Sequence, residues 1–140
     1  MGNTGVQFGV SASAVLRAAE AMLRALGGDE VSLLFAAVDM PDDPAAQLGL
    51  MDPGVEEVKF RPVVVRNLPT SNSGPRRRLE VLLSGSAVAE EAVARNAASP
   101  QAMFDSAIGV MHDGGVMHIE GVTTEYFAGT AYLYRLVVVE

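Results

Sequence analysis

The two histidines of the chain are the first residues whose type and spacing could do chemistry. His112 and His118 flank the turn residues Asp113-Gly114-Gly115, so they could face each other across a hairpin, with the Asp113 carboxylate nearby. Imidazole and carboxylate groups bind transition metals, but zinc takes three or four ligands, and the chain has no cysteine. We therefore interpret both histidines as ordinary hairpin residues and predict no metal site.

A group of aspartates suggests a second chemistry, the binding of calcium. An EF-hand loop needs oxygen ligands at alternate positions, a central glycine and a terminal glutamate. The aspartates of this chain do not follow that spacing, so we interpret them as solvated loop charges. They are Asp39, Asp42, Asp43 and Asp52.

Catalytic patterns are missing from the sequence. It contains no G-x-S-x-G, Walker A, G-x-G-x-x-G or H-E-x-x-H motif. The adjacent carboxylates Glu56-Glu57 and Glu90-Glu91 would point to different faces of a strand or a helix, which does not suit a general acid–base pair. We predict that the chain is not an enzyme and uses no cofactor.

The charge of the chain bears on its partners. The 17 acidic and 10 basic residues give a formal net charge of −7, which disfavours a groove that grips nucleic acid by its phosphates. One basic run stands out, Arg76-Arg77-Arg78, which follows Gly74-Pro75 and opens a predicted strand. It is either a contact for an anion or a protein partner or a solvated entrance to the strand.

The elements that would position these residues begin with a helix. The 140 residues fit one domain. Residues 13–26 predict a helix that ends at Gly27-Gly28. Its apolar residues recur at helical spacing and predict one buried stripe. The members of that stripe are Val15, Ala19, Met22, Leu23 and Leu26.

Short strands dominate the remainder of the sequence. Asp113-Gly114-Gly115 and Ala128-Gly129-Thr130 predict two hairpin turns, and Pro62 predicts an edge position or a bulge in its strand. The aromatic residues 126, 127, 132 and 134 fit cross-strand packing in the second hairpin. Residues 87–99 look helical, with a short turn after Ser99-Pro100. The predicted strands cover residues 31–38, 55–66, 78–83, 107–111, 116–122, 123–127 and 131–139.

We therefore expect a mainly β fold, a small antiparallel β-barrel or sandwich with an N-terminal helix and a short second helix. Residues 1–140 form a single domain, with an N-terminal arm at 1–10 and long loops at 39–54 and 67–78. No targeting or membrane-spanning segment is visible, so synthesis in the cytoplasm is expected. Leu48, Leu50 and Met51 place apolar side chains in the first long loop, which predicts a contact with a neighbouring copy or an adjacent ring.

The order of three stretches carries a resemblance to a known family. A helix runs into a strand in VLRAAEAMLRALGGDEVSLLF, a long loop precedes PVVVR and RRRLEVLLSGSAV, and GGVMHIEGVTTEYFAGTAYLYRLVVVE closes the chain. This arrangement resembles the head-completion proteins of tailed bacteriophages, also called head-closure, neck or head–tail joining proteins. The likeness covers most of the chain and rests on pattern and length.

The resemblance implies both a fold and a function. It implies a small β-barrel or sandwich with peripheral helices, in copies that form a ring, a dodecamer in that family, in the virion neck. Such a ring lies beneath the portal and adaptor, closes the head, gates the DNA and receives the tail terminator or tube; it has no catalytic residues. A tail terminator, an adaptor of an injection machine and, from a different class, a small ligand-binding β-barrel remain open.

Within such a ring, the charges of the chain suggest two roles. An acidic channel would repel DNA phosphates and let the duplex slide without sequence-specific binding. The arginine run 76–78 would relieve repulsion between acidic copies by pairing with carboxylates of an adjacent subunit or adaptor. The candidate carboxylates are Glu56, Glu57, Glu90 and Glu91.

Overall fold

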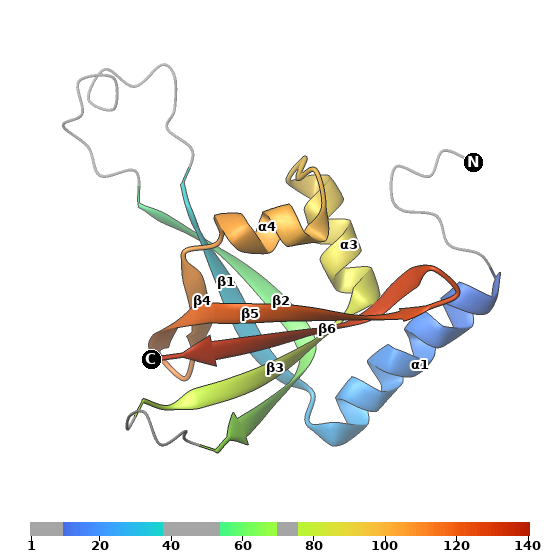
Figure 1. Ribbon diagram of the computed structural model, residues 1–140, viewed down its shortest axis with the longest axis horizontal. Helices are drawn as coiled ribbons and strands as arrows, with labels where there is room; N and C mark the ends of the chain where they lie inside the picture. The colour runs from blue at the N-terminus through green and yellow to red at the C-terminus, as the bar shows by residue number, and fades with distance from the viewer. Residues whose placement is uncertain (1–9, 38–53, 70–75) are drawn as a thin grey trace.

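The computed structural model describes residues 10–37, 54–69 and 76–140. The helix α1 (Val10–Leu26) leads into strands β1 (Asp29–Ala36), β2 (Val55–Leu68) and β3 (Arg78–Ser84). Helices α3 (Gly85–Ala94) and α4 (Pro100–Ser106) follow, and then strands β4 (Gly109–His112), β5 (Gly115–Phe127) and β6 (Thr130–Val139). The strands close into an antiparallel barrel in the order β1-β2-β3-β6-β5-β4 (Figure 1). The predicted fold class is confirmed, and of the two architectures it is the barrel.

The barrel interior is filled by side chains. Alternate residues of a strand point to the same face, so Val31, Leu33 and Phe35 of β1 all point inward and are almost fully buried. Strands β3 and β6 contribute inward residues with the same alternation. Those residues are Leu79, Val81, Leu83, Tyr134, Leu136 and Val138.

Both predicted hairpins form, each around a two-residue turn. Asp113 and Gly114 have φ angles of 50° and 77°, and Ala128 and Gly129 have φ angles of 49° and 78°. Positive φ at both central residues gives a turn whose twist matches that of the flanking strands. The predicted strands 116–122 and 123–127 are a single strand, β5, which pairs with β6 from His118 to Phe127 with two irregularities of register.

Pro62 lies at an irregularity in β2. Asp29 of β1 is opposite Val63 while Val31 is opposite Phe60, so β2 has one extra residue there. The predicted bulge is therefore confirmed. The edge position, the other alternative predicted for Pro62, does not apply, because β2 has β1 on one side and β3 on the other.

Helix α1 packs on the outer wall of the barrel. Leu23 is fully buried against Val64, Leu82 and Leu133, which come from β2, β3 and β6. The buried stripe consists of Ala12, Leu16, Ala19 and Leu23.

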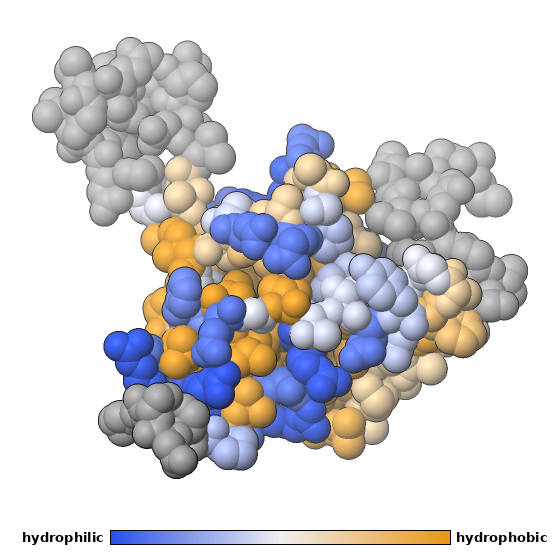
Figure 2. All heavy atoms as spheres, viewed as in Figure 1, coloured by the Kyte–Doolittle hydropathy of each residue, from blue (hydrophilic) through white to orange (hydrophobic). Residues whose placement is uncertain are grey.

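The stripe predicted for α1 is wrong in part, because Met22 and Leu26 are exposed. The outer face of the helix is itself largely apolar, and Figure 2 shows pale and deep orange atoms at the lower right, where α1 runs. Two stripes of equal period coexist on one helix, and periodicity does not distinguish the one that is buried.

Two helices, rather than the single helix and turn predicted for 87–104, connect β3 to β4. The Ser84 hydroxyl caps α3 and the Ser99 hydroxyl caps α4, each accepting a 3.1 Å hydrogen bond from a backbone N–H. Ser99-Pro100 starts a helix because serine suits the N-cap and proline the first helical turn. The loop predicted at 67–78 is shorter at its start, since β2 continues to Leu68.

Candidate functional site

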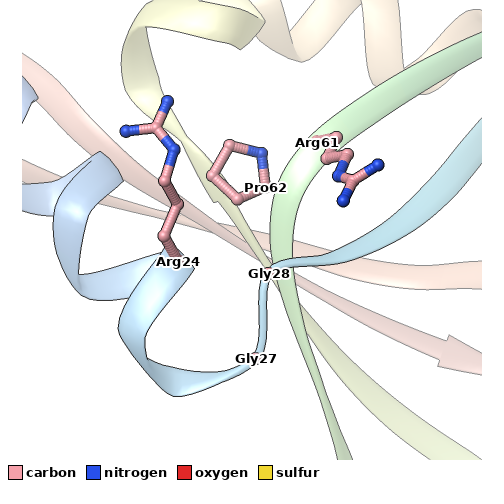
Figure 3. A pocket seen from close by; sticks show the side chains of 5 residues that line it. All are labelled: Arg24, Gly27, Gly28, Arg61 and Pro62. Atoms are coloured by element: carbon pink, nitrogen blue, oxygen red, sulfur yellow. The ribbon is translucent and has the colours of Figure 1, made fainter.

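A groove lies where α1 meets the barrel, at the C-terminal end of the helix. It has a volume of about 550 Å³ and is lined by Arg24, Gly27, Gly28, Arg61 and Pro62. Figure 3 shows the Arg24 and Arg61 side chains on either side of the Pro62 ring, one from α1 and the other from β2. We call this the arginine groove.

Local structure fixes both walls of the arginine groove. Gly28 adopts φ of 60° and donates its backbone N–H to the Leu23 carbonyl at 2.9 Å, which ends α1 in the manner expected of a glycine C-cap. Arg24 is in the last turn of the helix. Arg61 is exposed at the bulge of β2.

The two guanidinium groups of the groove are loosely held. Arg24 approaches Glu20 at 3.7 Å, with an exposed side chain. Arg61 has no ion-pair partner among the residues that the structure describes. An exposed pair at that distance contributes little to stability. The groove therefore offers two cationic, planar groups to a carboxylate or to an aromatic ring.

Most other arginines of the barrel wall form ion pairs with carboxylates of the same chain. Glu80 lies between Arg66 and Arg135, and Arg135 also approaches Glu125 at 3.8 Å. These side chains form a ladder of alternating charge across the outside of the barrel. Their pairing leaves the arginine groove as a distinct cationic feature.

Arg95 has a structural role at the end of the barrel. Its guanidinium carbon lies 3.7 Å from the centroid of the Phe35 ring, and its Nη1 atom is 2.8 Å from Glu56 and 3.8 Å from Glu91. The Arg95 side chain is only 20% exposed. A guanidinium over an aromatic face is stabilised by the ring quadrupole, so Arg95 caps the core beneath α3.

The run Arg76-Arg77-Arg78 lies just before and at the start of β3. Arg78 bonds Glu120 of β5 at 2.8 Å, and Arg77 approaches Glu140 at 3.9 Å. Arg76 is exposed, without an ion-pair partner in the described part of the chain. Two of the three arginines thus have partners within the chain, and a contact of the run with an adjacent subunit stays a prediction.

The structure does not gather the four candidate carboxylates at one place. Glu56 binds Arg95, and Glu57 accepts a 2.7 Å hydrogen bond from Ser32. Glu91 is in α3 beside Arg95, and Glu90 is exposed on the same helix. The three apolar candidates Leu48, Leu50 and Met51 lie outside the described residues.

The histidines do not face each other. His112 is opposite Gly115 and 3.4 Å from the Asp113 carboxylate, whereas His118 is opposite Val139. Within residues 10–37, 54–69 and 76–140, no three potential ligands gather to hold a metal ion. In the same ranges, no helix is both long and apolar enough to cross a membrane.

A second, smaller hollow of about 240 Å³ lies between α4 and β5. Two of its acidic groups are already engaged, because Asp105 accepts from Gln101 at 2.9 Å and Glu120 accepts from Arg78. His118 lies in its lining. This hollow has no nucleophile paired with a base and does not suggest catalysis.

Comparison with protein-family models, with curated proteins and with solved structures found no match. The arginine groove was not evident from the sequence, because Arg24 and Arg61 belong to different elements. The one available signal was an arginine directly before a proline within a strand, since a bulge there redirects the side chain.

Proposed function

We propose that this chain is a structural component of the neck of a tailed bacteriophage. Copies of it would form a ring between the portal or adaptor and the tail, closing the filled head and gating the DNA. The proposal rests on the resemblance of the sequence to head-completion proteins.

The observation that carries the proposal is the closed antiparallel barrel with α1 on its outer wall and α3 and α4 at its end. The resemblance implies a small barrel or sandwich with peripheral helices, and this fold is the first of those two. The surface adds support, because large apolar side chains are exposed at several places on it, and exposed apolar surface commonly marks contacts with other proteins.

A small ligand-binding barrel is the alternative from another class. A barrel of that kind encloses its ligand, whereas the interior of this barrel is filled by its own core side chains. The arginine groove and the smaller hollow are lined by residues around the barrel interior. The filled interior therefore favours an assembly role over a binding cavity.

The test is a phage that carries a stop codon in the reading frame of this chain. We expect DNA-filled heads that leak and separate tails of normal length, and we expect added purified protein to restore joining. Tails of uncontrolled length would identify a tail terminator instead. Normal virions lacking the chain would contradict any neck role.

A further inference from the structure

The β5–β6 hairpin exposes two aromatic rings at its tip. Tyr126 is 66% exposed and Phe127 is 48% exposed, although cross-strand packing was expected of both. They directly precede the tight turn at Ala128-Gly129, and Glu125 lies beside them in β5. We call residues 125–127 the aromatic tip.

The backbone of the aromatic tip pairs with β6 up to the turn, with one irregularity of register between Glu125 and Tyr126. Ala128 has φ of 49°, a region that residues with a Cβ rarely occupy. The flanking residues remain paired up to the turn, with Tyr126 opposite Ala131 and Phe127 opposite Thr130. A projection that is already ordered loses little conformational entropy when it binds.

The aromatic tip and the arginine groove complement each other chemically. The tip offers two exposed aromatic rings, and the groove offers two guanidinium groups, a proline ring and glycine backbone. Guanidinium groups bind the faces of aromatic rings, and aromatic and arginine residues are enriched among the residues that dominate protein interfaces. Leu26, which precedes Gly27 in the chain, is 64% exposed and adds apolar surface at this end of α1.

The tip and the groove lie near opposite ends of one helix. Figure 1 shows the β5–β6 turn toward the N-terminal end of α1 at the right, and the C-terminal end of α1 at the bottom. The 17 residues of α1 span about 25 Å. The two surfaces are therefore too far apart to meet within one chain, but two copies can join them.

We propose that the aromatic tip of one copy inserts into the arginine groove of the next copy. A contact between two different surfaces of one chain is heterologous, so it repeats from copy to copy and can close into a ring. This inference rests on the proposed ring and identifies the surfaces that form its seam. The occupant of the groove is a second copy of this chain.

Cysteine cross-linking tests the contact directly, because the chain has no cysteine of its own. One variant carries Phe127→Cys and the other carries Gly27→Cys. A Cβ at Gly27 meets its nearest neighbour at 3.8 Å, so that substitution fits. Mild oxidation of the mixture should yield cross-linked dimers at least tenfold above either variant alone. A chain with both substitutions should give a ladder of cross-linked oligomers that ends at the copy number of the ring.

The matched control pairs Gly27→Cys with Val116→Cys. Val116 is as exposed as the tip residues but lies at the opposite end of β5, beside the β4–β5 turn. We expect only background cross-linking from this pair. Equal yields from the Phe127 and Val116 mixtures would overturn the proposed contact.

A complementation experiment gives a second measurement. The tip variant Tyr126→Ser/Phe127→Ser and the groove variant Arg24→Ser/Arg61→Ser should each stay monomeric, whereas their mixture should form a dimer and stop there. Rings formed by both variants alone would disprove this seam and leave the neck function standing. Tip-to-groove cross-links in a chain that is absent from virion necks would keep the seam and disprove the neck function.

Discussion

Helices cover the barrel in two regions, and the two regions differ in kind. At the barrel end, α3 and α4 insert Val88, Ala92, Met103 and Phe104 into the main core, and Arg95 caps that core. On the outer wall, α1 buries one stripe over a small cluster centred on Leu23 and leaves its other face exposed.

The contrast shows that arginine residues have different roles in the two regions. Arg95 has two carboxylates and an aromatic ring around it, so its guanidinium group is engaged in contacts within the chain. Arg24 and Arg61 are exposed beside a groove. We expect the barrel end to respond to substitution through stability and the outer groove to respond through assembly.

The largest difference in stability between the two regions is expected from substitutions at the two glycines of the helix junctions. A Cβ at Gly85, where α3 begins, would lie 2.1 Å from the Ala131 carbonyl oxygen and 2.7 Å from the Tyr132 Cα atom. Gly85→Ala must displace backbone, so it should lower the free energy of unfolding by about 3 kcal/mol or more. Gly27→Ala, at the end of α1, should change it by less than about 0.5 kcal/mol. Urea denaturation measures both, and equal losses would contradict the contrast.

The two faces of α1 should differ next most strongly. Leu23 is fully buried and Met22 is 41% exposed, although the two residues are adjacent. Leu23→Ala should cost about 2 kcal/mol of unfolding free energy through lost burial and a cavity, and Met22→Ala less than about 0.5 kcal/mol. The midpoint of urea unfolding measures the difference. A larger loss of unfolding free energy from Met22→Ala than from Leu23→Ala would mean that the Met22 face of α1 is the one that packs on the barrel.

Substitutions of Arg95 and Arg24 should differ in their effect on stability by a smaller amount. Arg95→Met removes the contact with the Phe35 ring and two ion pairs, which should cost about 1 kcal/mol. Arg24→Met should leave stability unchanged while weakening the proposed seam between copies. Thermal unfolding and cross-linking yield, measured on both variants, check the two halves of this prediction. Equal changes in unfolding temperature and in cross-linking yield for the two variants would contradict the different roles of Arg95 in the core and Arg24 in the seam.

The smallest expected effect concerns alkaline pH at the barrel end. Burial raises the pKa of the Tyr134 hydroxyl above its ordinary value of 10.0, with a smaller contribution from Tyr126. The unfolded chain therefore releases this proton at lower pH than the folded chain, so stability falls as the pH rises above about 10. Tyr134→Phe should make that fall shallower. Urea unfolding at neutral and alkaline pH measures the slope, and an unchanged slope would exclude Tyr134 as its source.

Several elements could be predicted because their causes are local. The hairpin turns follow from residues that tolerate positive φ between alternating strands, and the end of α1 follows from Gly27-Gly28. The bulge at Pro62 follows from the missing backbone donor of proline. The second short helix, α4, was missed although Ser99-Pro100 is a recognisable start signal.

The remaining features depend on contacts between distant parts of the chain. The sequence alone determined a mainly β domain with an N-terminal helix, because hydrophobic period and turn chemistry act over a few residues. Only the tertiary structure decided which stripe of α1 is buried, since both stripes have the same period and the barrel wall covers just one. It likewise gave Arg95 its partners in β1 and β2 and left Arg24 and Arg61 beside a groove, because a side chain's role is set by the neighbours that folding brings to it.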